Sequence, residues 1–319
     1  MKDGETGYSA FLLAKRAIDA RSYNAGVWEA AARHLAPRGP HRPVRVLELG
    51  AGVGGMLERI LACCNMPLLH YEVVDLEPSH GEALRAEVRA FAERGGYRME
   101  EGEEGFVLEK EGEQVRIRIV IADVFDYCDR HAGRRFDLVI GQAFLDLFDI
   151  DRLMPRLLAL IEGGGGGYFP ITFDGVSAWL PVLDESLDDR IEALYHASID
   201  ARRARDEKSR RSRCGRHVAY WLARHPAVRE MKAGGSDWVV GGSDAQGLTR
   251  DERNFLQALL DGYENELRGH SALRGADFEG WLQSRRRTVE DGTAFFLAHQ
   301  LDVYVGTHFS VTSRERDDL

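Results

Sequence analysis

The sequence of 319 residues contains little cysteine and no long apolar run. Its four cysteines form no C-x-x-C pair and no zinc-ligand spacing, and neighbours such as Cys63 and Cys64 rarely bridge each other. We therefore expect reduced thiols and no bound metal. No stretch approaches eighteen consecutive apolar residues, and charges interrupt the first thirty residues. These absences predict a soluble, cytoplasmic protein without a membrane span or a signal peptide.

Positive charge is also in short supply. The chain has 42 lysines and arginines against 52 aspartates and glutamates, which gives a net charge of -10. Because a nucleic-acid binder usually needs a broad basic face, this balance argues against a nucleic-acid partner. The hydrophobic share of 44% is typical of a globular protein, and the length suits one large domain or two small ones. The oligomeric state is not indicated.

Strand and helix patterns alternate through the first half of the chain. The predicted strands are Val44–Leu49, His70–Asp75, Val115–Ala122, Phe136–Gly141 and Tyr168–Phe173, and helical patterns cover about 56–61, 81–94 and 152–161. The glycine-rich, acidic segment 95–113 is predicted to be an exposed loop or hairpin. Five glycines, Gly163–Gly167, are predicted to break the chain before the fifth strand. This alternation favours right-handed crossovers and a parallel sheet.

The flanking segments are mainly helical in pattern. Apolar spacing predicts an N-terminal helical extension over about 9–35, with an interruption near 22–26. The second half is less regular, with predicted helices at about 188–207, 216–224, 249–267 and 276–290 and predicted strands at Trp238–Val240 and Ala294–Val305.

The first strand leads directly into a glycine-rich turn, residues 50–55. Such a turn lets backbone approach a ligand closely and points helix-start amides at it, so a nucleotide-like ligand is expected here. The spacing fits two patterns. Gly50, Gly52 and Gly55 match the dinucleotide fingerprint G-x-G-x-x-G, while Glu48, Gly50, Gly52 and Gly54 match the E/D-x-G-x-G-x-G of methyltransferases. The glycines alone leave both ligands open.

Three acids near the predicted strand ends bear on the choice. Glu48 would repel a pyrophosphate but suits a ligand with a sulfonium and an amino group, directly or through loop amides. Asp75 ends the second strand twenty residues after Gly55, where a carboxylate accepts hydrogen bonds from ribose hydroxyls in either family. Asp123 ends the third strand, and an acid followed by the apolar Val124 suits an adenine amino group and ring face. A short-chain reductase would also need a Tyr-x-x-x-Lys pair, which the sequence lacks.

With the fourth strand and the turn before the fifth, residues 44–174 resemble the ordered motif series of class I S-adenosylmethionine-dependent methyltransferases. The resemblance implies an α/β, Rossmann-like fold with a seven-stranded, mostly parallel sheet, an antiparallel last strand, helices on both faces and helical cap insertions. It also implies that the glycine loop binds the methionine moiety. The second-strand acid, Asp75, would bind ribose, and the third-strand acid, Asp123, would bind adenine. The residue after the fourth strand, Gln142, would lie beside the reacting centre. The cofactor residues are then Glu48, Gly50, Ala51, Gly52, Gly54, Asp75, Leu76, Asp123, Val124 and Gln142.

The same resemblance sets the expected organisation of the chain. We expect one methyltransferase domain over 1–319, with N-terminal lid helices in 1–40 and the cofactor-binding core in 44–174. Cap insertions and the sixth strand are expected in 175–293, and the last strand in 294–305.

The substrate side has fewer signals. The basic run 202–216 is either a solvated face or a place where Arg213 and Arg216 hold a carboxylate or phosphate of the acceptor through forked hydrogen bonds. Asp174, at the carboxyl end of the fifth strand, is a candidate acceptor-side catalytic carboxylate. His299 is a candidate base, with a satisfied structural histidine as the alternative.

Together these features predict methyl transfer from S-adenosylmethionine to a small-molecule acceptor by in-line displacement. The protein would mainly position the reactants, and a base is needed only for an acceptor that loses its proton. The fourth strand ends in Gly-Gln-Ala-Phe and lacks the Asn/Asp-Pro-Pro-Tyr of amino-group nucleic-acid methyltransferases. The alternatives are an NAD-dependent oxidoreductase and a module that binds the cofactor without turnover.

Overall fold

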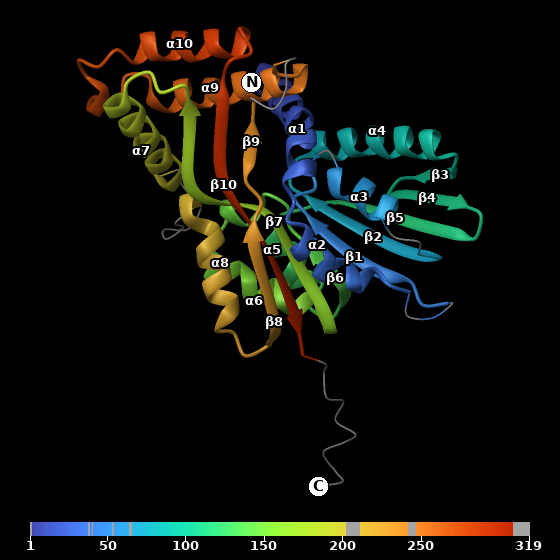
Figure 1. Cartoon of the computed structure of the whole chain (residues 1–319). Coiled ribbons are helices and arrows are strands. Elements are labelled where there is room, and N and C mark those ends of the chain that lie inside the picture. The colour runs from blue at the N-terminus through green and yellow to red at the C-terminus, as the bar shows by residue number, and fades with distance from the viewer. Residues whose placement is uncertain are drawn as a thin grey trace.

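A computed structural model describes residues 2–37, 39, 41–52, 54–63, 66–201, 211–241 and 247–308. The side chains of 2–10, 63 and 211 are outside this description. Within the described ranges, one sheet of ten strands runs through the molecule in the order β3-β4-β5-β2-β1-β6-β7-β10-β8, and β9 also pairs with β10 (Figure 1). The strands are β1 Val44–Leu49, β2 Leu68–Asp75, β3 Arg98–Gly102, β4 Gly105–Lys110, β5 Glu113–Ile121, β6 Phe136–Ile140, β7 Ile161–Leu180, β8 Val228–Gly235, β9 Trp238–Val240 and β10 Phe295–Thr307.

The central strands β5, β2, β1, β6 and β7 are parallel neighbours, and β10 is antiparallel to β7. β8 and β9 both pair with the side of β10 that faces away from β7, β9 with its first part and β8 with its last part. Together they occupy the place of the sixth strand that was predicted for a seven-stranded sheet. The predicted seven-stranded, mostly parallel core with an antiparallel last strand is therefore confirmed. The hairpin β3–β4 extends it, so the segment 95–113 is a hairpin that joins the sheet.

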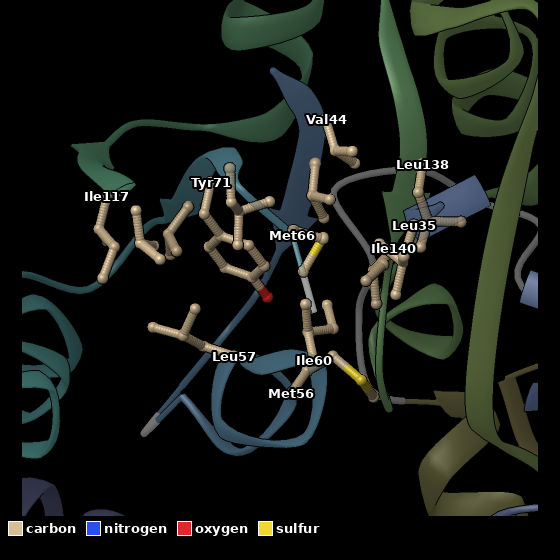
Figure 2. Close-up of a cluster of buried hydrophobic side chains, with 14 of the residues drawn as sticks. Leu35, Val44, Met56, Leu57, Ile60, Met66, Tyr71, Ile117, Leu138 and Ile140 are labelled. Atoms are coloured by element: carbon tan, nitrogen blue, oxygen red, sulfur yellow. The ribbon is translucent and has the colours of Figure 1, made fainter. Parts of the chain in front are cut away.

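Helices cover both faces of this sheet because successive strand residues point to opposite sides. In β1, Val44 and Val46 belong to a core with α2, α3 and α4, part of which is shown in Figure 2. Leu47 and Leu49 belong to a second core with α5, α6 and α8. The helices are α1 Lys2–Ser22, α2 Ala25–Ala32, α3 Gly55–Cys63, α4 Pro78–Gly95, α5 Val124–Arg130, α6 Ile150–Leu160, α7 Glu185–Ala201, α8 Cys214–Ala223, α9 Arg250–Leu267 and α10 Phe278–Glu290, with short 3₁₀ turns at Arg33–Leu35, Leu145–Leu147, Arg211–Arg213 and Ser271–Leu273.

A third core lies beyond the edge of the central sheet. There the distal ends of β7 and β10 reach the helices α1, α7, α9 and α10 (Figure 1). Trp179 and Phe296 meet at a ring-centroid distance of 4.7 Å, and Phe296 also contacts Phe255 of α9. The long strands therefore carry a helical layer that stands over the carboxyl ends of the parallel strands.

One predicted break in the chain is wrong. Gly163–Gly167 lie inside β7, and Gly166 and Gly167 pair with β10. Glycine is required there by close packing. A Cβ on Gly166 would lie 2.7 Å from the ring of His34, and one on Gly167 would lie 2.9 Å from Val305. The glycines therefore let neighbouring side chains approach the strand.

Candidate functional site

The glycine turn after β1 is shaped by left-handed backbone. Gly50, Gly52 and Gly54 have φ angles of 64°, 52° and 81°, a region that side-chain-bearing residues seldom adopt. A Cβ on Gly50 would lie 2.3 Å from Phe144, so this position also needs glycine for packing. The Gly50 amide donates to the Val74 carbonyl at 2.8 Å, which ties the turn to β2.

Asp75, at the end of β2, fixes the same turn from the side. Its carboxylate accepts hydrogen bonds from the amides of Gly52 at 3.1 Å and Glu77 at 3.0 Å. The Nδ1 atom of His80 lies 3.1 Å away. Asp75 thus places its carboxylate in the wall of a cavity at the ends of the strands. The amides of the glycine turn hold this carboxylate in place.

Asp123 occupies the corresponding position after β5. Its side chain caps α5 by accepting from the Phe125 amide at 2.8 Å. Asp123, Val124 and Leu76 all line the cavity, and Leu76 is 56% exposed. An acid flanked by two apolar side chains therefore sits between the ends of β2 and β5.

Gln142 follows β6 and is held by the N-terminal helix. Its Nε2 donates to Asp19 at 2.8 Å, and its Oε1 accepts from the Tyr23 hydroxyl at 2.9 Å. Asp19, which is 2% exposed, also accepts from the Trp238 indole at 2.9 Å and from Lys15 at 2.5 Å. This network joins α1 and β9 to the end of the central sheet.

These groups open on one cavity of about 1250 Å³. Its first half contains the glycine turn, the strand-end acids and Gln142. Its second half lies between the β7–β10 pair and the helices α1, α7 and α9, and most of its side chains are apolar or aromatic: Phe11, Ile171, Phe173, Tyr195, Ile199, Trp238, Leu259, Tyr263 and Phe296.

Glu48 lies beneath the turn and is not among the residues that line the cavity. It is 1% exposed and accepts a hydrogen bond from the Tyr71 hydroxyl at 2.5 Å. Burial raises the pKa of Glu48 to about 7, with the charge of Asp75 adding to the rise and the Tyr71 hydrogen bond opposing it. The structure thus brings Glu48 close to the turn without direct access to the cavity.

Asp174 and Arg216 contact each other. The Arg216 guanidinium Nε lies 2.9 Å and 3.1 Å from the two Asp174 oxygens, and the Arg216 amide donates to the same carboxylate at 2.7 Å. The His299 Nδ1 atom is hydrogen-bonded to an Asp237 carboxylate oxygen at 2.7 Å. The other ring nitrogen, Nε2, lies 3.9 Å from an Asp174 oxygen. Asp174, Arg213, Arg216 and His299 are not among the cavity-lining residues. The part of the basic run at 202–210 lies outside the described residues.

Two irregularities of β7 shape the cavity floor. The register with β10 shifts between Leu301 and Val303 and again between Ala298 and Gln300. At the first shift, the Ile171 amide donates to Asp302 at 2.9 Å, and Ile171 has a φ of 55°. At the second, the Asp174–Arg216 pair holds the strand beside Gly175 and Val176. Such bulges redirect side chains next to sites.

The sequence predicted lid helices and a cap but none of their individual site residues. Asp19 and the lining face of α9 belong to segments predicted as helices, and Tyr23 lies in the predicted interruption near 22–26. Arg59 of α3 also lines the cavity; its guanidinium lies 4.5 Å from the Tyr23 ring, and its Nε has no partner in the described part of the chain. The sequence signal for Asp19 was an acid next to Ile18, on the apolar pattern of the predicted N-terminal helix.

The described residues also bear on metal binding, thiols and membrane spans. They contain no cluster of three or more histidine, cysteine or acidic side chains placed to hold a metal ion. Cys128 and Cys214 are buried free thiols, while Cys64 lies outside the described residues. Across the described helices, none is both long enough and apolar enough to cross a membrane.

No family model matches the chain, and the search of curated proteins finds no relative. Solved structures do match. An O-methyltransferase family protein from Burkholderia thailandensis has a TM-score of 0.40 and 12% identity, over 89% of this chain and 57% of that one. A geranyl diphosphate C-methyltransferase from Streptomyces coelicolor, with S-adenosyl-L-homocysteine bound, has a TM-score of 0.40 and 11% identity, over 88% and 74%. The plantazolicin methyltransferase BpumL has a TM-score of 0.38 and 13% identity, over 96% and 86%.

All three are methyltransferases by name, the class that the motif series of this sequence resembles. The Rossmann-like fold assignment rests on the strand order and the directions given above.

Proposed function

We propose that the protein transfers a methyl group from S-adenosylmethionine to a small-molecule acceptor. The observation that supports this most strongly is the division of one cavity into two chemically different halves. One half has a glycine turn and two strand-end acids, and the other is largely apolar and aromatic. An adenosine-containing cofactor and a separate small substrate would each find a matching surface.

In this proposal, the turn at Gly50, Ala51, Gly52 and Gly54 approaches the methionine moiety. Asp75 accepts hydrogen bonds from the ribose hydroxyls, with Leu76 beside it, and Asp123 and Val124 contact the adenine. Arg59 provides a cation near the turn that suits the carboxylate of the methionine moiety. Gln142 lies beside the reacting centre and is oriented by Asp19 and Tyr23.

When bound, the cofactor would supply an electrophilic methyl group on a sulfonium. The acceptor lone pair forms the new bond to the methyl carbon as the carbon–sulfur bond breaks, and its electrons remain on sulfur. The chain contributes orientation and water exclusion, which can lower a bimolecular barrier substantially. We assign residues 1–40 to the lid and 175–293 to the cap of this arrangement.

The test is a thermal-shift titration with S-adenosylhomocysteine and, separately, NADH. A ligand that binds only the folded state stabilises it by about 2.7 kcal/mol at 100 times its Kd. S-adenosylhomocysteine should raise Tm, and Asp75→Ala should remove most of the shift. The control is Asp126→Ala, which removes an exposed acid of α5 that does not line the cavity. A shift with NADH alone would favour the oxidoreductase, and cofactor binding without product across an acceptor panel would favour the non-catalytic module.

A further inference from the structure

A polar cluster closes the far end of the apolar half of the cavity. Ser177 of β7 and Tyr263 of α9 line the cavity there, and Glu192 and His196 of α7 stand behind them. The Ser177 hydroxyl donates to Glu192 at 2.5 Å and lies 2.9 Å from the His196 Nε2. The Tyr263 hydroxyl donates to both Glu192 oxygens, at 2.9 and 3.0 Å.

The number of protons in this cluster determines what it offers to the cavity. Each hydroxyl has one proton, and both are used on Glu192. Because Ser177 has no second proton, the His196 Nε2 must donate to it. Burial raises the pKa of Glu192, and the two hydroxyl donors partly offset that rise. Both hydroxyl protons are therefore directed at Glu192 and not at a ligand. Ser177 is partly exposed, whereas Tyr263 is fully buried and its hydroxyl lies 3.3 Å from the Ser177 oxygen, so Ser177 offers the more accessible lone pair.

Gln300 adds a third acceptor atom on the same cavity wall. It is 2% exposed and lines the cavity, yet its Oε1 has no hydrogen-bond partner among the described residues. Ala298, two residues earlier on β10, is the register partner of Ser177. A buried carbonyl oxygen without a donor destabilises the folded protein, so a hydrogen-bond donor from a ligand would relieve that cost.

The charged side chains around the apolar half of the cavity indicate which ligands it can bind. In the described part of the chain, the lysine, arginine and histidine side chains that line the cavity belong to α1, α3 and α4: Lys15, Arg16, Arg59 and His80. The walls from β7, β10, α7 and α9 thus contribute no cation. Besides aromatic faces and hydroxyl oxygens, α9 adds the Asp261 carboxylate and the Asn265 amide. An anionic group would be desolvated there without compensation.

We propose that this end of the cavity, the distal subsite of Ser177, Tyr263 and Gln300, binds an uncharged O–H or N–H donor on an otherwise apolar or aromatic substrate. The proposal deepens the proposed function, because it assigns a chemical class to the methyl acceptor. It also replaces the anionic acceptor that Arg213 and Arg216 indicated in the sequence.

The experiment compares 2-naphthol, naphthalene and 2-naphthoate as probes in the presence of saturating S-adenosylhomocysteine, with Kd measured by ligand-observed NMR titration. One net hydrogen bond corresponds to about a threefold to tenfold preference for 2-naphthol over naphthalene. The naphthoate should bind about tenfold or more weakly than 2-naphthol. Equal affinities, no binding of 2-naphthol, or tighter binding of the naphthoate would each overturn the proposal.

The variants separate this subsite from the rest of the cavity. Gln300→Leu keeps a similar volume and removes the free oxygen, so the preference for 2-naphthol should fall to about onefold. Tyr263→Phe should also reduce it, and serves if Gln300→Leu fails to fold. Gln283→Leu makes the same change at an exposed position of α10 that does not line the cavity, and it should leave the preference intact. If both subsite variants kept the parent preference for 2-naphthol, the subsite proposal would be wrong. If the parent protein did not bind S-adenosylhomocysteine, that result would count against the methyltransferase function alone.

Discussion

At the scale of single residues, Glu48 is a buried acid whose charge changes near neutral pH. Its pKa is raised to about 7 in the folded protein, from an ordinary value of 4.5. The unfolded chain therefore loses this proton at lower pH than the folded chain does. As a result, the free energy of unfolding contributed by Glu48 falls as pH rises from about 4.5 through 7.

We predict that the unfolding free energy of the parent falls by about 2 to 3 kcal/mol more than that of Glu48→Gln between pH 5 and pH 8. The glutamine keeps the shape and can still accept from Tyr71, so the difference isolates the charge. Urea denaturation of both proteins at several pH values measures it. Parallel stability curves would show that the group titrates normally.

The sequence could predict which strand-end residues gather at the proposed cofactor side, apart from Glu48, which does not line the cavity. It could not predict the residues of the other half. Gly50, Asp75, Asp123 and Gln142 each lie within two residues of the end of a strand, so local order alone brings them to one sheet edge. Asp19, Tyr263 and Gln300 reach the cavity from helices and a strand far apart in the chain, and only their packing brings them together. Asp174 and Arg216 were recognised as notable charges, but their pairing depends on the bulge in β7.

At the scale of elements, strands with strong apolar patterns were predicted closely. β1 has the predicted bounds because a buried run leads directly into glycine. β8 was missed, since Val228–Gly235 is mostly half-buried or exposed and has no apolar alternation. The glycine-rich start of β7 was mistaken for a break because glycine usually weakens strands, whereas here it permits the contacts of His34 and Val305.

The Asp174–Arg216 pair should stabilise the second bulge of β7 by joining it to α8. We predict a coupling free energy of about 1 kcal/mol in a double-mutant cycle of Asp174→Asn and Arg216→Gln, measured by urea unfolding. The value is modest because the Arg216 side chain is 56% exposed. Affinity for S-adenosylhomocysteine should not change, as neither residue lines the cavity. A coupling near zero would contradict the prediction. It would mean that the backbone amide of Arg216, and not its guanidinium, is the partner that stabilises Asp174.

At the scale of the whole molecule, the cavity lies where the central sheet, the N-terminal helix and the cap meet. α1 contributes lining residues to both halves, from Phe11 to Ala20, and contacts α9 and α4. Since α1, α7 and α9 all line this cavity, we expect ligand entry to involve movement of α1 or of the cap. Asp19 is the one buried acid of α1 that holds both Gln142 and Trp238 in the described structure.

We predict that saturating S-adenosylhomocysteine slows amide hydrogen exchange in residues 11–22, because binding should favour the closed arrangement of α1. Asp19→Ala should weaken that protection, since it removes the shared acceptor of Lys15, Gln142 and Trp238. Peptides from α6, on the opposite face of the sheet from α3, should not respond and serve as the control. If α1 exchanged equally fast with and without ligand while Tm rose, the helix would be a fixed wall of the cavity, and entry would have to occur through the cap formed by α7 and α9.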